Sequence, residues 1–247
     1  MNNSKVIGGF SSGEPWIGLV DGCYAIILTL LVIELPALII EIIGLTNEHT
    51  AMGLALFAIF VDVLGYLFAT ILIFDMWSIH KGYLSICSAT RFSSIGTMMI
   101  LWLASLIPPA IYLVEHFSQK IILDEIHSES LLSNTMFETY LFRVSEISII
   151  LIIYLILNFL IKKEAVNFKR KDPKIRFELK EIKNILNFRI VIGLILFILS
   201  ILIRGDKISS MPISFAIFPF GIYSIFTLIP YEWITKINNS LPSSGNN

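Results

Sequence analysis

The strongest constraint on this chain is the length of its apolar segments. An α-helix rises about 1.5 Å per residue, so about 20 apolar residues are needed to cross the hydrocarbon core of a bilayer. Backbone groups find no water there, so single apolar segments that cross must be helical. We therefore expect an all-α, polytopic membrane protein with six transmembrane helices, at 16–35, 53–77, 94–114, 139–161, 188–203 and 213–233.

The composition agrees with a membrane protein and argues against nucleic-acid binding. Hydrophobic residues make up 55% of the chain, charged residues only 15%, and the mean hydropathy is +0.79. An average soluble domain has about 25% charged residues. The 18 lysines and arginines are balanced by 19 acidic residues, so the basic excess of a nucleic-acid-binding protein is missing. We expect the lipid bilayer as a partner, and no nucleic acid.

The sequence carries none of the common catalytic or metal-binding motifs. Cys23 and Cys87 lie in or beside apolar segments without CxxC or CxxH spacing, which favours small buried side chains over a disulfide or a metal site. HExxH, GxSxG and phosphate-loop patterns do not occur, and neither does a TVGYG filter. We predict a protein that is not an enzyme and that holds no metal or other cofactor.

The positions of the basic residues predict the orientation. Ten of the 18 fall between Lys162 and Arg189, whereas the loops expected on the opposite side carry only Lys120, Arg204 and Lys207. Because loops rich in lysine and arginine stay in the cytoplasm, both termini are expected to be cytoplasmic.

Segment 162–187 is predicted to be a basic, amphipathic, cytoplasmic linker. Asp172 can cap a helix that begins at Pro173. Such a helix lies against the cytoplasmic leaflet, where it fixes the topology and contacts anionic lipid, or else binds a partner. Its apolar stripe consists of Ile175, Leu179 and Ile182.

An acidic residue stands at the start of the first apolar segment, LVDGCYAIILTLLVIELP (19–36). Asp21 is costly in a membrane unless it is neutral, hydrated or paired. The second apolar segment returns to the same side at Trp77 and His80, so we expect Asp21, Trp77 and His80 to form a polar network that packs the helices together. The alternative is an acid stabilised by the helix dipole and interfacial water.

One narrow face of the first segment carries small and β-branched side chains. At about 100° per residue, the four members of this face fall within about 60° of one another. The face either lines an axial pathway, if several copies surround an axis, or makes a close helix contact. At the outer end, Glu34 either attracts cations in an oligomer or is simply solvated. The face consists of Gly22, Ile26, Thr29 and Ile33.

Two stretches resemble the transmembrane protein 175 family of potassium channels. The first helix of that family has an R-x-x-x-F-S-D motif followed by a DGxxAIxxTLLVLEL pattern. The second stretch begins MWSIHKGYL, with Trp77 and His80 in the W-x-x-H spacing of the family and Pro108 at its proline position. The first pattern is matched by Asp21, Gly22, Ala25, Ile26, Thr29, Leu30, Leu31, Val32, Glu34 and Leu35.

The resemblance implies a homotetrameric, potassium-permeable channel in a prokaryotic plasma membrane. One first helix from each subunit would surround the axis. Carried over by position, Ile26 would form the main constriction, with Thr29 one turn outward and Ile33 above it. Permeant K⁺ would be the only bound ion, and a hydrophobic ring would replace a carbonyl filter.

The chain departs from the family pattern at Pro15, which replaces the motif arginine, and at Leu19, Val20 and Met98. Without that arginine, His80 is left to pair with Asp21. The alternative function is a non-conducting membrane scaffold or a proton-linked carrier built on the same bundle. Its protonatable sites would be Asp62 and the pair of Asp21 and His80.

Overall fold

The computed structural model describes residues 14–45, 52–86, 90–124, 129–168 and 173–202, together with residues 223, 225 and 226. These residues are almost entirely helical. In chain order the helices are α1 (Glu14–Leu45), α2 (Met52–Ile86), α3 (Arg91–Ser105), α4 (Ile107–Asp124), α5 (Glu129–Phe168) and α6 (Pro173–Leu202).

Five stretches of these helices are long and apolar enough to cross a membrane. The all-helical class is therefore confirmed, and the chain is compatible with an integral, multi-pass membrane protein. The predicted sixth span, 213–233, lies outside the described residues except for Tyr223, Ile225 and Phe226. The five stretches are Trp16–Ile40, Ile59–Ile86, Arg91–Val114, Val144–Lys163 and Phe177–Leu199.

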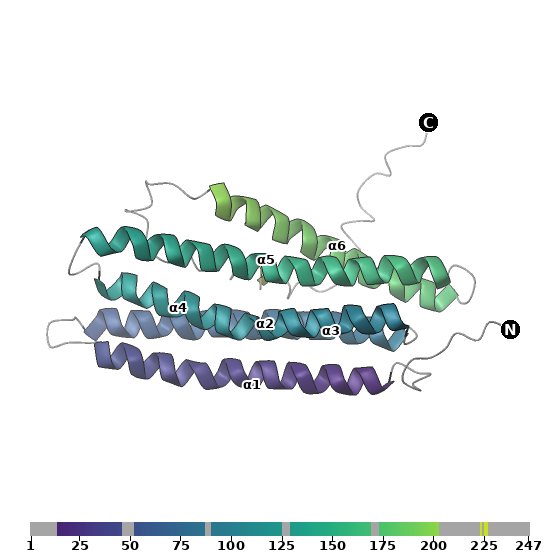
Figure 1. The fold of residues 1–247 in the computed structure, drawn as a ribbon, viewed down its shortest axis with the longest axis horizontal. Coiled ribbons are helices and arrows are strands. Elements are labelled where there is room, and N and C mark those ends of the chain that lie inside the picture. The colour runs from purple at the N-terminus through teal and green to yellow at the C-terminus, as the bar shows by residue number, and fades with distance from the viewer. Residues whose placement is uncertain are drawn as a thin grey trace.

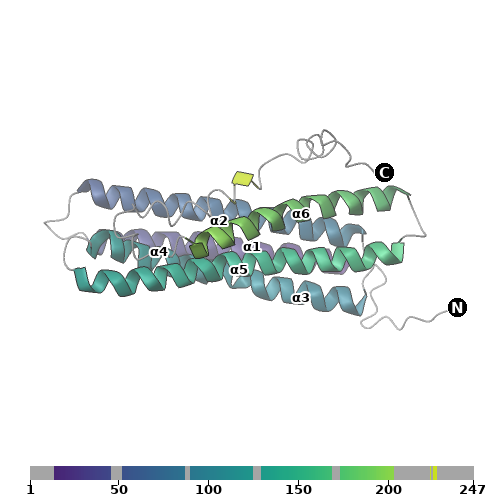
Figure 2. The ribbon, with the colours of Figure 1, turned by 90° about the horizontal axis from the view of Figure 1, so that it is seen from above.

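The helices lie side by side along the long axis of the molecule (Figures 1 and 2). α1 packs mainly on α2, whereas α5 packs on α4 and α6, and α3 lies against α5. The start of α1, the end of α2, the start of α3, the end of α5 and the start of α6 share one end of the bundle, on the right in Figure 1. We call this end the basic end, because Lys81, Arg91, Lys162 and Lys163 all lie there.

The predicted third span is made of two helices. α3 ends at Ser105, and the N–H of Leu106 donates to the carbonyl of Leu103 at 3.1 Å, which closes a tight last turn. α4 then begins immediately before Pro108 and Pro109. A proline lacks a backbone N–H and its ring clashes with the preceding turn, so the α-helical hydrogen bonding is interrupted at this point.

The linker helix and the fifth span form one continuous helix, α6, which differs from the sequence-based expectation of a separate surface helix. Leu179 is buried, and Ile182 packs against the hydrophobic core. The Cδ1 atom of Ile182 lies 3.6 Å from the position that a Cβ on Gly82 of α2 would take. Ile182 of the predicted apolar stripe therefore contacts the end of α2 within the same chain.

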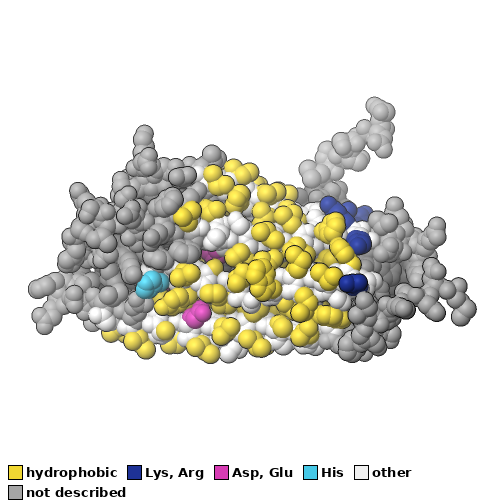
Figure 3. Space-filling model, in the orientation of Figure 1, with side chains coloured by type: hydrophobic (Ala, Val, Ile, Leu, Met, Phe, Trp, Pro, Cys, Tyr) yellow, Lys and Arg dark blue, Asp and Glu magenta, His cyan; other side chains and the backbone are white. Residues whose placement is uncertain are grey.

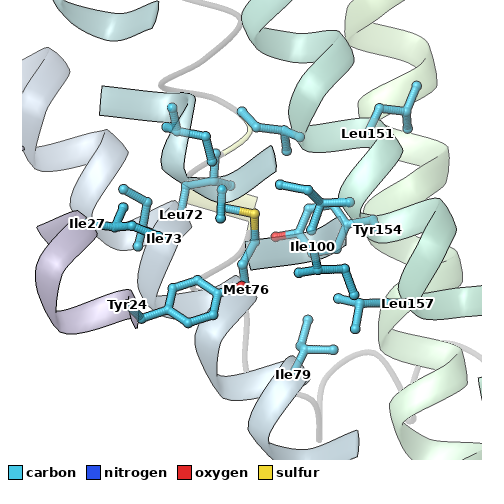
Figure 4. Close-up of a cluster of buried hydrophobic side chains, with 14 of the residues drawn as sticks. Tyr24, Ile27, Leu72, Ile73, Met76, Ile79, Ile100, Leu151, Tyr154 and Leu157 are labelled. Carbon is cyan, nitrogen blue, oxygen red and sulfur yellow. The ribbon is translucent and has the colours of Figure 1, made fainter. Parts of the chain in front are cut away.

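The hydrophobic core joins α1, α2, α3 and α5 (Figure 4). Tyr24 and Ile27 of α1 meet Leu72, Ile73 and Met76 of α2, and all five side chains are buried. Within the described residues, α1 is thus attached to the bundle along one face. The other side chains labelled in Figure 4 come from α2, α3 and α5; they are Ile79, Ile100, Leu151, Tyr154 and Leu157.

Candidate functional site

The face of α1 formed by Gly22, Ile26, Thr29 and Ile33 points away from the other described helices. Ile26 is 62% exposed, Ile33 is 63% exposed, and Thr29 is also exposed. A Cβ built on Gly22 would meet no atom within 4 Å. Within the described residues, this face therefore makes no close helix contact, and we call it the open face of α1.

The opposite face of α1 holds the helix in place. Only 22% of the apolar stretch of α1 is buried, the smallest share among the five candidate spans. The buried side chains of α1 form one stripe that packs against the core. The buried apolar side chains of α1 are Val20, Tyr24, Ile27, Leu31 and Leu38.

The hydroxyl of Thr29 has a fixed direction on the open face. It donates to the carbonyl oxygen of Ala25, one turn earlier, at 2.7 Å. Because its proton is engaged by the helix backbone, the lone pairs of its oxygen remain available to an external cation or water. Ile26 and Ile33 lie about 10 Å apart along the axis on either side of it. The open face therefore places one hydroxyl oxygen between two apolar positions.

Asp21 joins α1 to α2 through two hydrogen bonds. Its Oδ1 accepts from Trp77 Nε1 at 2.7 Å, and its Oδ2 accepts from Lys81 Nζ at 2.9 Å. The ammonium of Lys81 also lies 4.8 Å from the centre of the Trp77 ring. We call Asp21, Trp77 and Lys81 the α1–α2 network. The acid at the start of the first span is therefore paired.

The predicted pairing of Asp21 with His80 is wrong, because Lys81 takes that place. Residues four apart share a helix face, so Lys81 stands over Trp77, whereas His80 points toward the interior. His80 is fully buried, and its Nε2 lies 3.3 Å from Thr97 Oγ1 of α3. The centres of the His80 and Tyr24 rings lie 6.1 Å apart, and the two ring planes are nearly perpendicular. His80 therefore connects α2 to α3 and α1 without contacting Asp21.

Asp21→Asn should have a small effect on stability. Both side chains of the pair are about 40% exposed, at 39% for Lys81 and 40% for Asp21. Exposed pairs contribute about 0–1 kcal/mol, and salt weakens them. The asparagine oxygen can still accept from Trp77, so Asp21→Ala should cost more than Asp21→Asn. Thermal unfolding in detergent at low and high salt measures both. If Asp21→Asn and Asp21→Ala lose the same stability, the hydrogen bond from Trp77 is not the main contribution of Asp21.

A second polar network crosses the bundle between α2, α5 and α6. Asp75 Oδ2 accepts from Tyr154 Oη at 2.7 Å, and its Oδ1 accepts from Arg189 NH2 at 3.3 Å. The Arg189 side chain is only 3% exposed. Tyr223 Oη donates to the backbone carbonyl of Arg189 at 3.1 Å, and Arg189 NH1 donates to the carbonyl of Phe226. We call this set the α2–α6 network.

Two other predicted acids take different positions. Glu34 is half-buried, and its Oε2 has no hydrogen-bond partner among the described residues. Asp62 is buried, at 1% exposure, on the same helix as Asp75. Neither acid lies on the open face of α1.

The sequence analysis placed Lys81 in a cytoplasmic loop and counted Arg189 with the cytoplasmic basic residues, although the predicted span 188–203 contains it, and so it missed both as members of polar networks. Two signals were available. Lys81 is one helical turn after Trp77, and Arg189 falls inside an apolar stretch, where a charged side chain needs a partner. Neither signal identifies the partner, because Asp21 and Asp75 are 60 and 114 residues away along the chain.

No family model, curated protein or solved structure matches this chain.

Proposed function

We propose that this protein is a potassium-permeable cation channel, formed as a homotetramer around the open faces of four α1 helices. The observation that carries the proposal is the outward position of Ile26, Thr29 and Ile33 on a helix that is otherwise fixed to the bundle. An axial pore needs a helix with one face free of its own subunit. The resemblance of the first helix to the transmembrane protein 175 family supports the same arrangement.

In such a pore Ile26 forms the main constriction and Ile33 forms a second apolar ring. A ring of isoleucine side chains carries no charge, so passage depends on whether the ring is wide enough to stay hydrated. Removing hydration water from the cation at this ring costs free energy. Thr29 oxygens between the two rings replace some of that water, which favours the ion that is easier to dehydrate. This is the basis on which potassium is expected to pass more readily than sodium.

Ile26→Asn should raise cation flux and reduce the preference for potassium over sodium. The amide group hydrates the constriction and removes the apolar barrier. The measurement is potassium and sodium flux into liposomes that contain the purified protein. The matched control is Ile195→Asn, because Ile195 of α6 is also exposed, at 52%, but lies on another helix. The control should leave both fluxes unchanged.

Two results would overturn the channel proposal. One is a monomer, counted as single photobleaching steps of a labelled protein in liposomes. The other is a tetramer in which Ile26→Asn and Ile195→Asn alter flux equally, because the constriction would then lie elsewhere.

A proton-linked carrier is the second candidate function, and one observation favours it. Asp62 and His80 are both buried inside a single subunit, at 1% and 0% exposure. A carrier built on these groups needs no oligomer. Uptake of a substrate driven by a pH gradient, and lost in Asp62→Asn, would favour the carrier over the channel.

A further inference from the structure

We propose that the lipid-facing surface of α3 and α5 binds an anionic phospholipid, with Arg91 and Lys163 at its headgroup. This proposal is independent of the channel function. It concerns a part of the molecule that neither polar network uses. The surface is made of two apolar stripes, each with a basic residue at the basic end of the bundle.

The stripe on α3 begins at Arg91 and continues at intervals of 4, 7, 8 and 11 residues, so its members share one helix face. The four apolar members are all more than half exposed. Because the stripe is exposed and apolar within a candidate span, hydrocarbon chains are the environment it fits. These members are Ile95, Met98, Met99 and Trp102, at 52%, 55%, 51% and 66% exposure.

The stripe on α5 ends at Lys163 and runs back through Phe159, Leu155 and Ile152 at intervals of 4, 8 and 11 residues. These three apolar side chains are 59%, 45% and 44% exposed. The spacing is that of one helix face, as on α3. A second exposed apolar stripe therefore also leads to a basic residue.

The two stripes adjoin at the basic end. The centres of the Phe92 and Phe159 rings lie 5.7 Å apart, and Lys163 Nζ lies 3.1 Å from the centre of the Phe92 ring. The ammonium of an α5 residue is thus held on the first turn of α3, the turn that begins at Arg91. Figure 3 shows an apolar face with lysine and arginine side chains gathered at one end.

Charge complementarity selects an anionic headgroup over a zwitterionic one. Among the described residues, neither Arg91 nor Lys163 forms an ion pair, and both side chains are exposed. Basic side chains between helices at the membrane surface are a common setting for anionic headgroups. The apolar stripes below them accept acyl chains, which a free phosphate ion does not have. The geometry therefore points to a lipid as the occupant.

Trp102 provides a direct reporter of this lipid. It lies 11 residues beyond Arg91, which is about 16 Å along the helix and close to the depth of the middle to lower part of an acyl chain. The experiment measures the quenching of tryptophan fluorescence by phosphatidylglycerol or phosphatidylcholine brominated at mid-chain, in the full-length protein in liposomes. Subtraction of the Trp102→Phe signal isolates the contribution of Trp102.

We expect brominated phosphatidylglycerol to bind about fivefold more tightly than brominated phosphatidylcholine at the Trp102 position, the factor that corresponds to about one basic contact. In Arg91→Gln/Lys163→Gln this ratio should fall close to unity. Lys180→Gln is the matched control, because Lys180 is an exposed lysine of α6 at the same end, and it should keep the ratio. Inorganic phosphate should compete no better than chloride at equal ionic strength.

Three outcomes would overturn the proposal. The wild-type ratio could equal one, which would mean that the surface takes any lipid. The ratio could persist in the double variant or fall equally in Lys180→Gln, which would mean that general surface charge causes it. Finally, Trp102 could be quenched by neither lipid, which would mean that another copy of the chain covers this face.

Discussion

Replacing Arg189 with methionine should lower the stability of the bundle by about 3–5 kcal/mol, the cost of removing one partner of a buried ion pair. Arg189 is 3% exposed and Asp75 is 15% exposed, so little water reaches the pair. Without the guanidinium, the hydrogen bond from Tyr154 is the one that the Asp75 carboxylate keeps within the described part of the chain. SDS-induced unfolding of the purified protein, followed by tryptophan fluorescence, measures this loss.

The double variant Asp75→Leu/Arg189→Met should recover a large part of the stability that either single change removes. Replacing both members of a buried pair leaves no charge without a partner, and apolar side chains of similar size fill the space. The two single losses therefore should not add. Additive losses would contradict the assignment of Asp75 and Arg189 as partners.

Asn187→Ala serves as the neutral control for this network. The side-chain amide of Asn158 on α5 donates to Asn187 Oδ1 on α6 at 3.1 Å. Uncharged hydrogen bonds between membrane helices contribute about 0.6 kcal/mol on average. A loss in Asn187→Ala as large as that in Arg189→Met would mean that any change between α5 and α6 destabilises the bundle.

The all-helical class could be predicted from the sequence because apolar length alone forces helices in a membrane. The sequence also predicted that the face containing Ile26, Thr29 and Ile33 is distinct, since the position of each side chain around a helix follows from its number. The structure adds that this face is open. Periodicity cannot distinguish an open face from a packed one, because both are apolar or small in lipid.

The polar partners were harder to predict than the helices. Asp21 and Trp77 were expected in one network, and a hydrogen bond joins them. The choice between His80 and Lys81 depends on a rotation of about 100° around α2, which is smaller than the uncertainty in how two predicted helices face each other. Arg189 was counted with the cytoplasmic basic residues although it is the second residue of the predicted span 188–203, so no partner was sought for it. One continuous α6 instead carries Arg189 into the bundle.

Gly96 allows α3 and α5 to approach closely, and Gly96→Ala should therefore destabilise the protein by about 1–3 kcal/mol, as overpacking of a filled core does. A Cβ at this position would lie 2.7 Å and 2.8 Å from the two methyl carbons of Leu160 and 3.2 Å from its Cγ. Because Cγ is close as well, rotation of the Leu160 side chain about its Cβ–Cγ bond does not relieve the clash. Leu160 itself is 1% exposed.

The partner change separates overpacking from other effects of the added methyl group. Leu160→Ala alone should cost about 2–5 kcal/mol through the cavity it leaves. In that background Gly96→Ala should cost almost nothing, because the clashing atoms have gone. Gly18→Ala is the control, since a Cβ on Gly18 meets nothing within 4 Å. It should be neutral or slightly stabilising, because alanine favours the helix over glycine. An equal cost of Gly96→Ala with and without Leu160 would contradict the contact.

Because Gly96 packs against Leu160, Gly96→Val should also change the lipid preference of the surface formed by α3 and α5. Small residues let membrane helices approach closely, and here that approach brings Phe92 against Phe159 and Lys163 over the first turn of α3. A larger side chain at Gly96 forces the two helices apart near the basic end. If the variant still folds, Lys163 should lose its contact with Phe92. The preference of Trp102 for brominated phosphatidylglycerol should then weaken although no charge has changed. Restoring the space with Leu160→Ala should restore that preference, which general surface charge would not explain.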